Sequence, residues 1–224
     1  MKVVVIGGGR SGTNLAARLS HDKHKVTLID RDEAVAQRAF EQFGLATLTG
    51  DGTDPRVLRE AEADRADVLA ALLRRDADNL AIALLARDMG AKRVMVRMRD
   101  VAYRGVYKAA GVQEVLSEVD VLVGALMTAV EHPQVTRSMV LGGGESVAFE
   151  IVVPSLARAA GKTVRELAAD PGFPRGCAFA GIGDSEGRIT APRGDSTVRG
   201  ACSVILVASQ EHIEDVAAFL TAKA

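Results

Sequence analysis

The sequence predicts an α/β protein in which a doubly wound parallel sheet is followed by a small α+β domain. Over residues 1–132, short runs of Val, Ile, Leu and Ala alternate with segments of helical periodicity, which favours a parallel sheet covered by helices. A glycine-rich loop joins the first of these runs to the first helical segment. After residue 133 the strand-like runs follow one another through Gly and Asp turns, so we expect the architecture to change there.

Six strands are expected in the first part, because six short apolar runs resemble strands buried on both faces: residues 3–6, 26–29, 45–48, 68–73, 94–98 and 112–116. Helices are expected between them, first around Leu15 and Leu19 and then over residues 34–43, 55–60, 76–89, 102–110 and 121–130. Asp54 followed by Pro55 is typical of a helix N-cap and a first helical residue. Gly90 and Gly111 are expected to end helices.

The second part is predicted to be a smaller domain with consecutive strands. Strands are expected over residues 147–153, 177–182, 188–191 and 203–208, and helices over residues 163–168 and 213–220. Residues 133–144, which end in Leu-Gly-Gly-Gly, are predicted to be a linker. The predicted domains are therefore residues 1–132 and 145–224.

Composition limits the classes of function. The 224 residues carry 28 basic and 29 acidic side chains; residues 1–132 have 19 of each and residues 133–224 have 9 and 10, without the basic excess of a nucleic-acid-binding protein. Cys177 and Cys202 make no disulfide framework and lie in apolar runs, so we expect small core residues and a reducing cytoplasm. No signal peptide is visible, and the longest strongly apolar stretch, residues 121–130, falls far short of the ~20 residues that cross a bilayer. Any contact with a membrane is expected to run through a partner.

Residues 7–12 read Gly-Gly-Gly-Arg-Ser-Gly and match G-x-G-x-x-G, the dinucleotide-binding fingerprint of Rossmann-like domains. The spacing alone is weak evidence, but here it follows a predicted strand and opens a predicted helix. Gly7 permits the tight turn, Gly9 lets a pyrophosphate approach the backbone, and Gly12 lets helix and strand pack closely. The free N–H groups of the helix N-terminus attract phosphate. The alternative is a turn that packs on itself and binds no ligand.

Asp30 ends the second predicted strand, 18 residues beyond Gly12. A carboxylate at this position accepts hydrogen bonds from both ribose hydroxyls of an adenosine, and it repels a 2′-phosphate. NAD is therefore expected to fit better than NADP. Arg31 weakens this exclusion slightly, because an arginine nearby can accommodate a 2′-phosphate.

Three weaker features lie at the same predicted edge of the sheet. Residues 50–55, Gly-Asp-Gly-Thr-Asp-Pro, would flank an adenine or else form only a helix-capping turn. The backbone after the fourth strand, at Leu72 and Leu73, would line the ligand, with Asp76 capping the next helix. Either Arg97 or Arg99 is expected to face the crevice and neutralise phosphate, unless both are solvated or interface residues.

No catalytic residue and no metal ligand is assigned from the sequence. None of the four histidines lies at the predicted carboxyl edge of the sheet, and no Cys/His metal cluster or Ser–His–acid set is recognisable. Tyr103 and Tyr107 lie one helical turn apart and are expected to pack on a helix face.

This combination resembles the regulator-of-potassium-conductance (RCK) family, and within it the soluble regulatory subunits of Trk/Ktr potassium uptake systems. In the first part the resemblance rests on residues 4–12, on Ile29 and Asp30, on residues 50–58 and on residues 76–80. The Gly-Asp-x-Thr-Asp motif at residues 50–54 is the most telling, because ordinary dehydrogenases lack it. In the second part it rests on Gly-Lys-Thr-Val-Arg-Glu-Leu at residues 161–167 and Pro-Arg-Gly-Asp-Ser-Thr at residues 192–197.

The resemblance implies a regulatory ligand, NAD(H) or ATP/ADP, in the first domain, and a homo-oligomeric ring, often of eight RCK domains. It implies an integral-membrane, potassium-translocating subunit of Trk/Ktr type as partner, a position at the cytoplasmic face of the cell membrane, and no nucleic acid. Carried over by residue and combined with the crevice residues above, the candidate nucleotide-binding residues are Gly7, Gly8, Gly9, Arg10, Ser11, Gly12, Asp30, Arg31, Asp51, Gly52, Thr53, Leu72, Leu73 and Arg97.

Two departures from the family pattern are visible. Where the family has Ser-Pro-Glu after the sixth strand, this chain has Ser117-Glu118-Val119, which puts the cation site associated with that glutamate in doubt. The late Gly-Asp turn of the second domain is Gly200-Ala201 here.

The expected function is a nucleotide-sensing regulator that gates a potassium uptake channel or transporter through ligand-dependent rearrangement of its ring, without enzymatic activity. Two other interpretations remain. A small NAD-dependent oxidoreductase would need a catalytic acid or base in the crevice, and a nucleotide-sensing transcriptional repressor would need a basic helix or wing.

Overall fold

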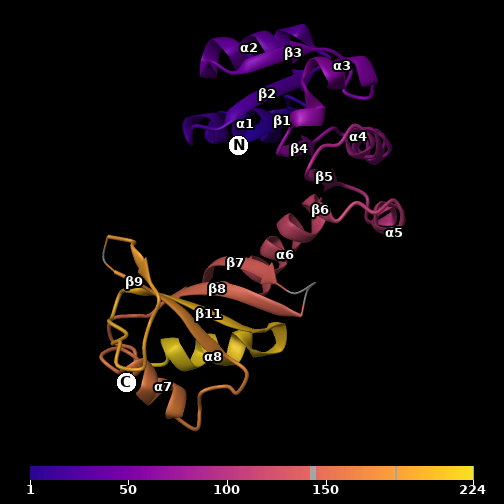
Figure 1. The fold of residues 1–224 in the computed structure, drawn as a ribbon. Coiled ribbons are helices and arrows are strands. Elements are labelled where there is room, and N and C mark those ends of the chain that lie inside the picture. Colours follow the sequence, from indigo (N-terminus) through magenta and orange to yellow (C-terminus); the bar gives the residue numbers. More distant parts are fainter. Residues whose placement is uncertain (142–144, 185, 224) are drawn as a thin grey trace. The chain divides into compact units, whose positions relative to one another are not determined.

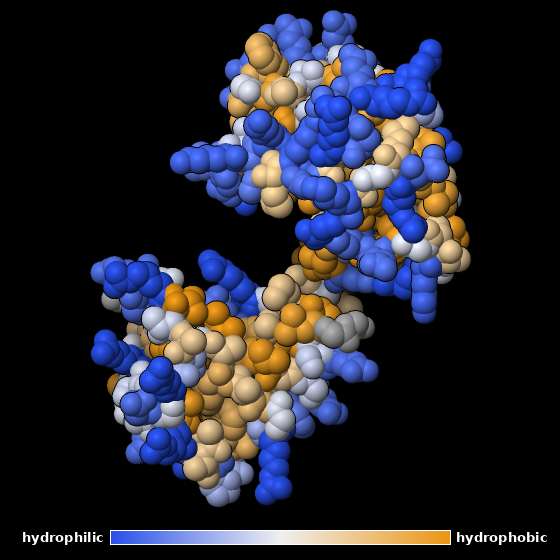
Figure 2. Space-filling model, in the orientation of Figure 1, coloured by the Kyte–Doolittle hydropathy of each residue, from blue (hydrophilic) through white to orange (hydrophobic). Residues whose placement is uncertain are grey.

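The computed structural model describes residues 1–141, 145–184 and 186–223, and the chain divides into two compact units, Met1–Val119 and Asp120–Ala224 (Figure 1). Each unit has its own sheet and its own hydrophobic core. In Figure 2 the drawn face of unit 1 is mostly hydrophilic, whereas hydrophobic residues gather on the face of unit 2 that carries the first helix and strand of that unit.

Unit 1 contains six parallel strands in the order β3-β2-β1-β4-β5-β6. Their bounds are β1 Lys2–Ile6, β2 Lys25–Asp30, β3 Ala46–Thr49, β4 Val68–Ala71, β5 Val94–Met98 and β6 Glu114–Ser117. The strand order turns around between β1 and β4, which is where open α/β sheets form a crevice at the carboxyl ends of the strands. The predicted doubly wound sheet is confirmed.

Helices cover both faces of this sheet, and the alternation of side chains along β1 explains why. Val3 and Val5 point to one face, against α1 (Arg10–His21) and α2 (Glu33–Phe43). Val4 and Ile6 point to the other face, against α3 (Pro55–Glu60), α4 (Asp76–Asp88) and α5 (Arg104–Ala109). A strand buried on both sides needs an uninterrupted apolar run, which β1 has.

The helix boundaries follow the local signals in the sequence. Asp54 caps α3 by accepting a hydrogen bond from the N–H of Arg56, and Pro55 is the first helical residue, as predicted. Gly90 and Gly111 follow α4 and α5 with φ of +97° and +69°, left-handed values that glycine adopts without strain.

Unit 2 contains an antiparallel sheet in the order β10-β9-β11-β8-β7. The strands are β7 Val135–Leu141, β8 Ser146–Val152, β9 Ala178–Gly183, β10 Ile189–Thr190 and β11 Ser203–Ser209. Helix α7 (Val164–Ala169) lies between β8 and β9 in the chain, and helix α8 (Ile213–Thr221) follows β11. Inward side chains of β8 and β11, such as Phe149 and Leu206, form one core with Leu167 of α7 and Leu220 of α8. The predicted small α+β domain is confirmed.

The linker predicted for residues 133–144 is wrong over residues 135–141, which form β7 and pair with β8. The sequence did not predict this strand because Thr136, Arg137 and Ser138 interrupt its apolar pattern. An edge strand tolerates such polar residues. The glycines at 142–144 lie outside the described residues.

Unit 1 also ends earlier than the predicted residue 132. All but the first two residues of α6 (Glu118–Glu131) belong to unit 2, where Gly124 lies so close to Val140 of β7 that a Cβ would touch it.

Both cysteines are core residues, as predicted. Cys202 is buried in the core of unit 2, and Cys177 packs against the same core. Burial raises the pKa of both thiols, so they are protonated near neutral pH. In the part of the chain that the structure describes, no helix is both long enough and apolar enough to span a bilayer.

Candidate functional site

The glycine loop between β1 and α1 brings bare backbone to the carboxyl edge of the sheet. Gly7 has φ of +104°, and a Cβ on Gly12 would lie against the carbonyl oxygen of Gly7, so both positions require glycine. A Cβ on Gly9 would meet no atom within 4 Å. Gly9 is the N-cap of α1, which has no side-chain cap and no acidic residue in its first turn. The N–H groups of that turn are therefore free to bind an anion.

The carboxylate of Asp30 is held in place by two backbone N–H groups. Gly8 N–H donates to Oδ2 at 2.6 Å, and Asp32 N–H donates to Oδ1 at 2.9 Å. A side chain on Gly8 would collide with Val35 and crowd Asp30, so this glycine is needed for the position of the acid. Each carboxylate oxygen keeps a second lone pair, which can accept from a ligand hydroxyl.

A third segment, the loop between β3 and α3, lies at the same edge. Asp51 accepts hydrogen bonds from the N–H and the hydroxyl of Thr53 at 2.9 and 2.7 Å, and these bonds lower the pKa of its carboxyl. A Cβ on Gly52 would run into Ile6 of β1, so the loop packs directly on the end of the central strand. The capping of α3 is done by Asp54, which leaves Asp51 and Thr53 available to a ligand.

The turn after β4 is organised by a buried amide that the sequence analysis gave no role. The Asn79 side chain accepts from the Leu73 N–H at 2.8 Å and donates to the carbonyl oxygens of Leu73 and Arg97, both at 3.0 Å. It thereby ties the ends of β4 and β5 together. The available signal was the asparagine in the first turn of α4, directly after a strand.

Asp76 has a different role from the predicted one. The N-cap of α4 is Arg75, and the nearly buried Asp76 carboxylate accepts from the N–H groups of Arg99 and Asp100 at 3.1 and 3.0 Å. It also accepts from the buried hydroxyl of Tyr107 at 3.1 Å. Burial, together with the nearby Asp76 charge, raises the pKa of Tyr107 above its usual value, so this hydroxyl stays protonated. Tyr107 packs in the core, as expected for it.

Both Arg97 and Arg99 face the crevice, whereas only one of the two was expected there from the sequence. Arg97 Nη2 donates to the Leu73 carbonyl oxygen at 3.0 Å. Glu118 Oε2 lies 3.5 Å from Arg97 Nη1 and 3.4 Å from Arg99 Nε. Glu118 is the residue that replaces the family's proline, and no ligand role was predicted for it.

These segments enclose one open cleft of about 1120 Å³. Every predicted binding residue lines it except Gly8, which acts behind Asp30. The remaining lining residues are Ile6, Ile29, Asp32, Val35, Gly50, Arg74, Arg75, Asp78, Arg99 and Glu118, of which the sequence analysis had named only Gly50 and Arg99 as cleft candidates, among its weaker features.

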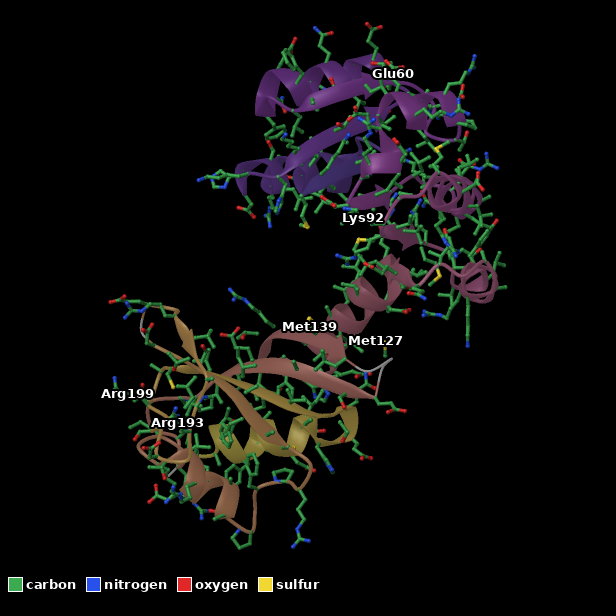
Figure 3. All side chains as sticks on the ribbon, viewed as in Figure 1. Glu60, Lys92, Met127, Met139, Arg193 and Arg199 are labelled. Atoms are coloured by element: carbon green, nitrogen blue, oxygen red, sulfur yellow. The ribbon has the colours of Figure 1, made fainter. Side chains whose placement is uncertain are left out.

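At the opposite edge of the sheet, the Asp67 carboxylate accepts from Lys92 Nζ at 2.6 Å and from the backbone N–H of Lys2 at 2.8 Å, so its charge is paired (Lys92 is labelled in Figure 3). Among the described residues, no group of three or more His, Cys, Asp or Glu side chains is placed to hold a metal ion.

Comparison with known proteins gives consistent matches. A family model described as the TrkA-N domain matches residues 3–118, and one described as the TrkA-C domain matches residues 148–221. A Trk system potassium uptake protein TrkA homolog of Methanothermobacter thermautotrophicus is 31% identical over 167 residues, which cover 75% of this chain and 77% of that protein. A TrkA homolog of Pyrococcus abyssi is 27% identical over 225 residues, 96% of each chain.

A solved structure described as the GsuK channel bound to NAD has a TM-score of 0.68 and 18% identity to this chain. The match covers all of this chain and 40% of that one. It shows that the two share a fold.

Proposed function

The chain belongs to the TrkA family of RCK-type proteins, and from that premise we propose that it is a nucleotide-sensing regulatory subunit of a Trk/Ktr-type potassium uptake system. One observation carries the proposal. The uncapped N-terminus of α1 and the fixed carboxylate of Asp30 line the same cleft, at the turning point of a parallel sheet.

The proposed ligand is NAD(H), ATP or ADP, which share an adenosine ribose and a diphosphate. The ribose hydroxyls would donate to Asp30, the phosphates would lie at the first turn of α1 with Arg10 and Ser11, and the loop of Asp51 would flank the adenine. A cleft of about 1120 Å³ has room for a dinucleotide. The NAD named for the GsuK channel structure supports the same ligand class.

The lining of the cleft favours a regulator over an oxidoreductase. Among the described lining residues there is no His, Cys, Tyr or Lys to exchange a proton with a substrate. Two of its acids are already engaged, Asp30 by backbone N–H groups and Glu118 by arginines. Three further acids, Asp32, Asp51 and Asp78, also line the cleft, so the preference for a regulator rests on the lack of His, Cys, Tyr and Lys among the described lining residues.

A homo-oligomeric ring is the proposed assembly, and α6 supplies the observation that supports it. Residues spaced by three and four along this helix form one exposed apolar face: Val119, Leu122, Val123, Leu126, Met127 and Val130. Met127 and the neighbouring strand's Met139, both labelled in Figure 3, are 50% and 61% exposed. A second copy of the chain would remove this surface from water.

Regulation would follow from unequal affinity of the nucleotide for two conformations of the ring. A coupling of about 1–3 kcal/mol per site changes an equilibrium roughly 5- to 150-fold, and several sites in one ring add. The ring would act on a membrane subunit from the cytoplasmic side and would touch the membrane only through that subunit.

Gly9→Asp tests the proposal, because it should separate ligand binding from folding. Gly9 has φ −63° and ψ 178°, which any residue adopts, and its Cβ would enter open space. Aspartate is a favoured N-cap, so α1 should be as stable as in the wild type or slightly more so. The new carboxylate would stand where the phosphates are proposed to bind and repel them.

We expect Gly9→Asp to lose nucleotide binding in calorimetric titration, to unfold at or above the wild-type temperature, and to lose nucleotide control of potassium uptake in cells that carry the membrane subunit. Asp88→Ala, at an exposed site on α4, is the control and should behave as wild type. If potassium uptake in cells with Gly9→Asp still depends on nucleotide, the proposed sensing role is contradicted. If cells that lack the protein take up potassium as cells with the wild type do, the proposed regulatory role is contradicted.

A further inference from the structure

Apart from Arg31, which follows Asp30, and Asp78, which lies 3.7 Å from Arg75, the charges that line the cleft are sorted along the sheet. Asp30, Asp32 and Asp51 lie at the ends of β2 and β3, whereas most of the lining arginines lie at the ends of β4 and β5: Arg74, Arg75, Arg97 and Arg99. The α1 N-terminus lies between the two groups, because β1 lies between β2 and β4 in the sheet. A nucleotide with its ribose at Asp30 and its first phosphates at α1 would therefore point its far end toward the arginines.

Glu118 already occupies the space between two of these arginines. A single oxygen, Oε2, lies 3.5 Å from Arg97 Nη1 and 3.4 Å from Arg99 Nε. Arg97 is the more firmly held of the two, since its side chain is 18% exposed and its Nη2 is bonded to the Leu73 carbonyl oxygen. Its Nε is buried and has no hydrogen-bond partner among the described residues, so this guanidinium has donor capacity to spare.

The contacts of Glu118 are long enough to be displaced. Both distances exceed the 2.7–2.9 Å of a well-made charge-assisted hydrogen bond, and neither pair is bidentate. Glu118 is 43% exposed and Arg99 is 49% exposed. Ion pairs of this kind stabilise a fold very little. A phosphate, which carries more charge and three oxygens, would satisfy the same two guanidinium groups better.

We propose that Glu118 is an internal competitor for the terminal phosphate of a bound nucleotide, and that it makes the cleft discriminate between nucleotides by their number of phosphates. The proposal rests on the nucleotide-sensing function above and adds a specificity residue to it. A nucleoside triphosphate reaches Arg97 and Arg99 and must displace Glu118. A monophosphate ends at α1 and leaves the Glu118 contacts intact.

A purely structural role for Glu118 makes a different prediction. As the first residue of α6 it carries a negative charge near a helix N-terminus, which stabilises the helix slightly. Its removal would then lower the unfolding temperature a little and leave the ranking of nucleotides unchanged.

Glu118→Gln in the full chain separates the two roles, because it removes the charge and keeps the size of the side chain. We expect the variant to bind ATP roughly three- to tenfold more tightly than the wild type, which corresponds to about 0.6–1.4 kcal/mol. The affinity for AMP should change less than about twofold. Calorimetric titration with ATP, ADP and AMP at one fixed salt concentration measures both.

Glu114→Gln is the matched control. It makes the same change of charge four residues earlier, on β6, where Glu114 pairs with Arg93 at 2.8 Å and does not line the cleft. Its nucleotide affinities should equal those of the wild type, and any gain it shared with Glu118→Gln would be a general effect of net charge and would overturn the proposal.

Three further results would also overturn it: an unchanged ATP affinity in Glu118→Gln, a weaker one, or an equal gain for AMP and ATP. In each of these cases nucleotide binding itself stands, so the proposed function survives. If the wild type binds NADH but none of the three nucleotides at millimolar concentration, this inference fails and the proposed function stands. If it binds neither NADH nor any of the three, the proposed function fails, and this inference fails with it.

Discussion

Asp30→Ala is the most informative single change in unit 1, because the same carboxylate supports the fold and is proposed to bind the ligand. The substitution leaves the N–H groups of Gly8 and Asp32 without their acceptors. Hydrogen bonds to a charged group contribute about 1.5–3 kcal/mol each, but water can replace an acceptor at this half-buried site. We therefore expect the free energy of unfolding to fall by about 1–3 kcal/mol in total.

The effect on ligands should be larger and should depend on the ribose. Loss of the acceptors for the ribose hydroxyls should weaken NADH and ATP by roughly ten- to a hundredfold. NADPH should weaken less, because a repulsion between the carboxylate and the 2′-phosphate disappears at the same time, and the neighbouring Arg31 can contact that phosphate.

Calorimetric titration with NADH, ATP and NADPH measures these affinities, and urea unfolding measures stability. Tyr107→Phe is a control of similar stability, since it weakens the same unit at a site that does not line the cleft. If Asp30→Ala binds NADH and ATP as the wild type does, or if Tyr107→Phe loses affinity equally, Asp30 does not hold the ribose and the proposed occupation of the cleft is refuted.

Two further predictions concern stability. Tyr107→Phe removes the hydroxyl contacts to the Asp76 carbonyl and carboxylate, at 3.0 and 3.1 Å, and should cost about 1–2 kcal/mol in urea unfolding while leaving the affinity for ATP unchanged. Asp51→Asn should destabilise the protein at neutral pH. Because hydrogen bonds from Thr53 hold the folded-state pKa of Asp51 below its ordinary value of 3.8, that stability is present above 3.8 and is lost as the pH falls through the folded value. The difference in unfolding midpoint between the variant and the wild type should therefore shrink from about pH 4 downward, and a constant difference would contradict the assignment.

The parts of the site that the sequence predicted are those built from contiguous residues. The strand, loop and helix of residues 3–21 and the acid at the end of the next strand are local signals, and the structure places them as expected. The long-range roles of Asn79 and Asp76 could not be assigned in this way, because their partners Arg97, Arg99, Asp100 and Tyr107 are 18 to 31 residues away in the chain and meet them only when β4, β5 and α5 pack. The predicted cap at Asp76 was wrong by one residue, since Arg75 has the extended backbone of an N-cap.

The boundary between the units was missed for a related reason. Residues 121–130 form a good helix by periodicity, but periodicity does not say which sheet a helix packs against. Gly124 faces β7, and Thr128 one turn later is buried. The strand β7 itself has a weak pattern because one side of an edge strand meets water.

The position of Glu118 between Arg97 and Arg99 bears on whether this end of the cleft favours an anion or a cation. The family's cation-associated glutamate is replaced by Val119, and the neighbouring Glu118 lies within 3.5 Å of one guanidinium and 3.4 Å of another. A cation at this carboxylate would be repelled by both arginines at close range, whereas an anion that displaces the carboxylate would be attracted by both. Arg74 lines the same end and adds to this field, whereas the charge of Arg75 is offset by Asp78, 3.7 Å away. If the proposed function holds, we therefore expect this end of the cleft to favour a phosphate group over a cation that would need Glu118 as its ligand.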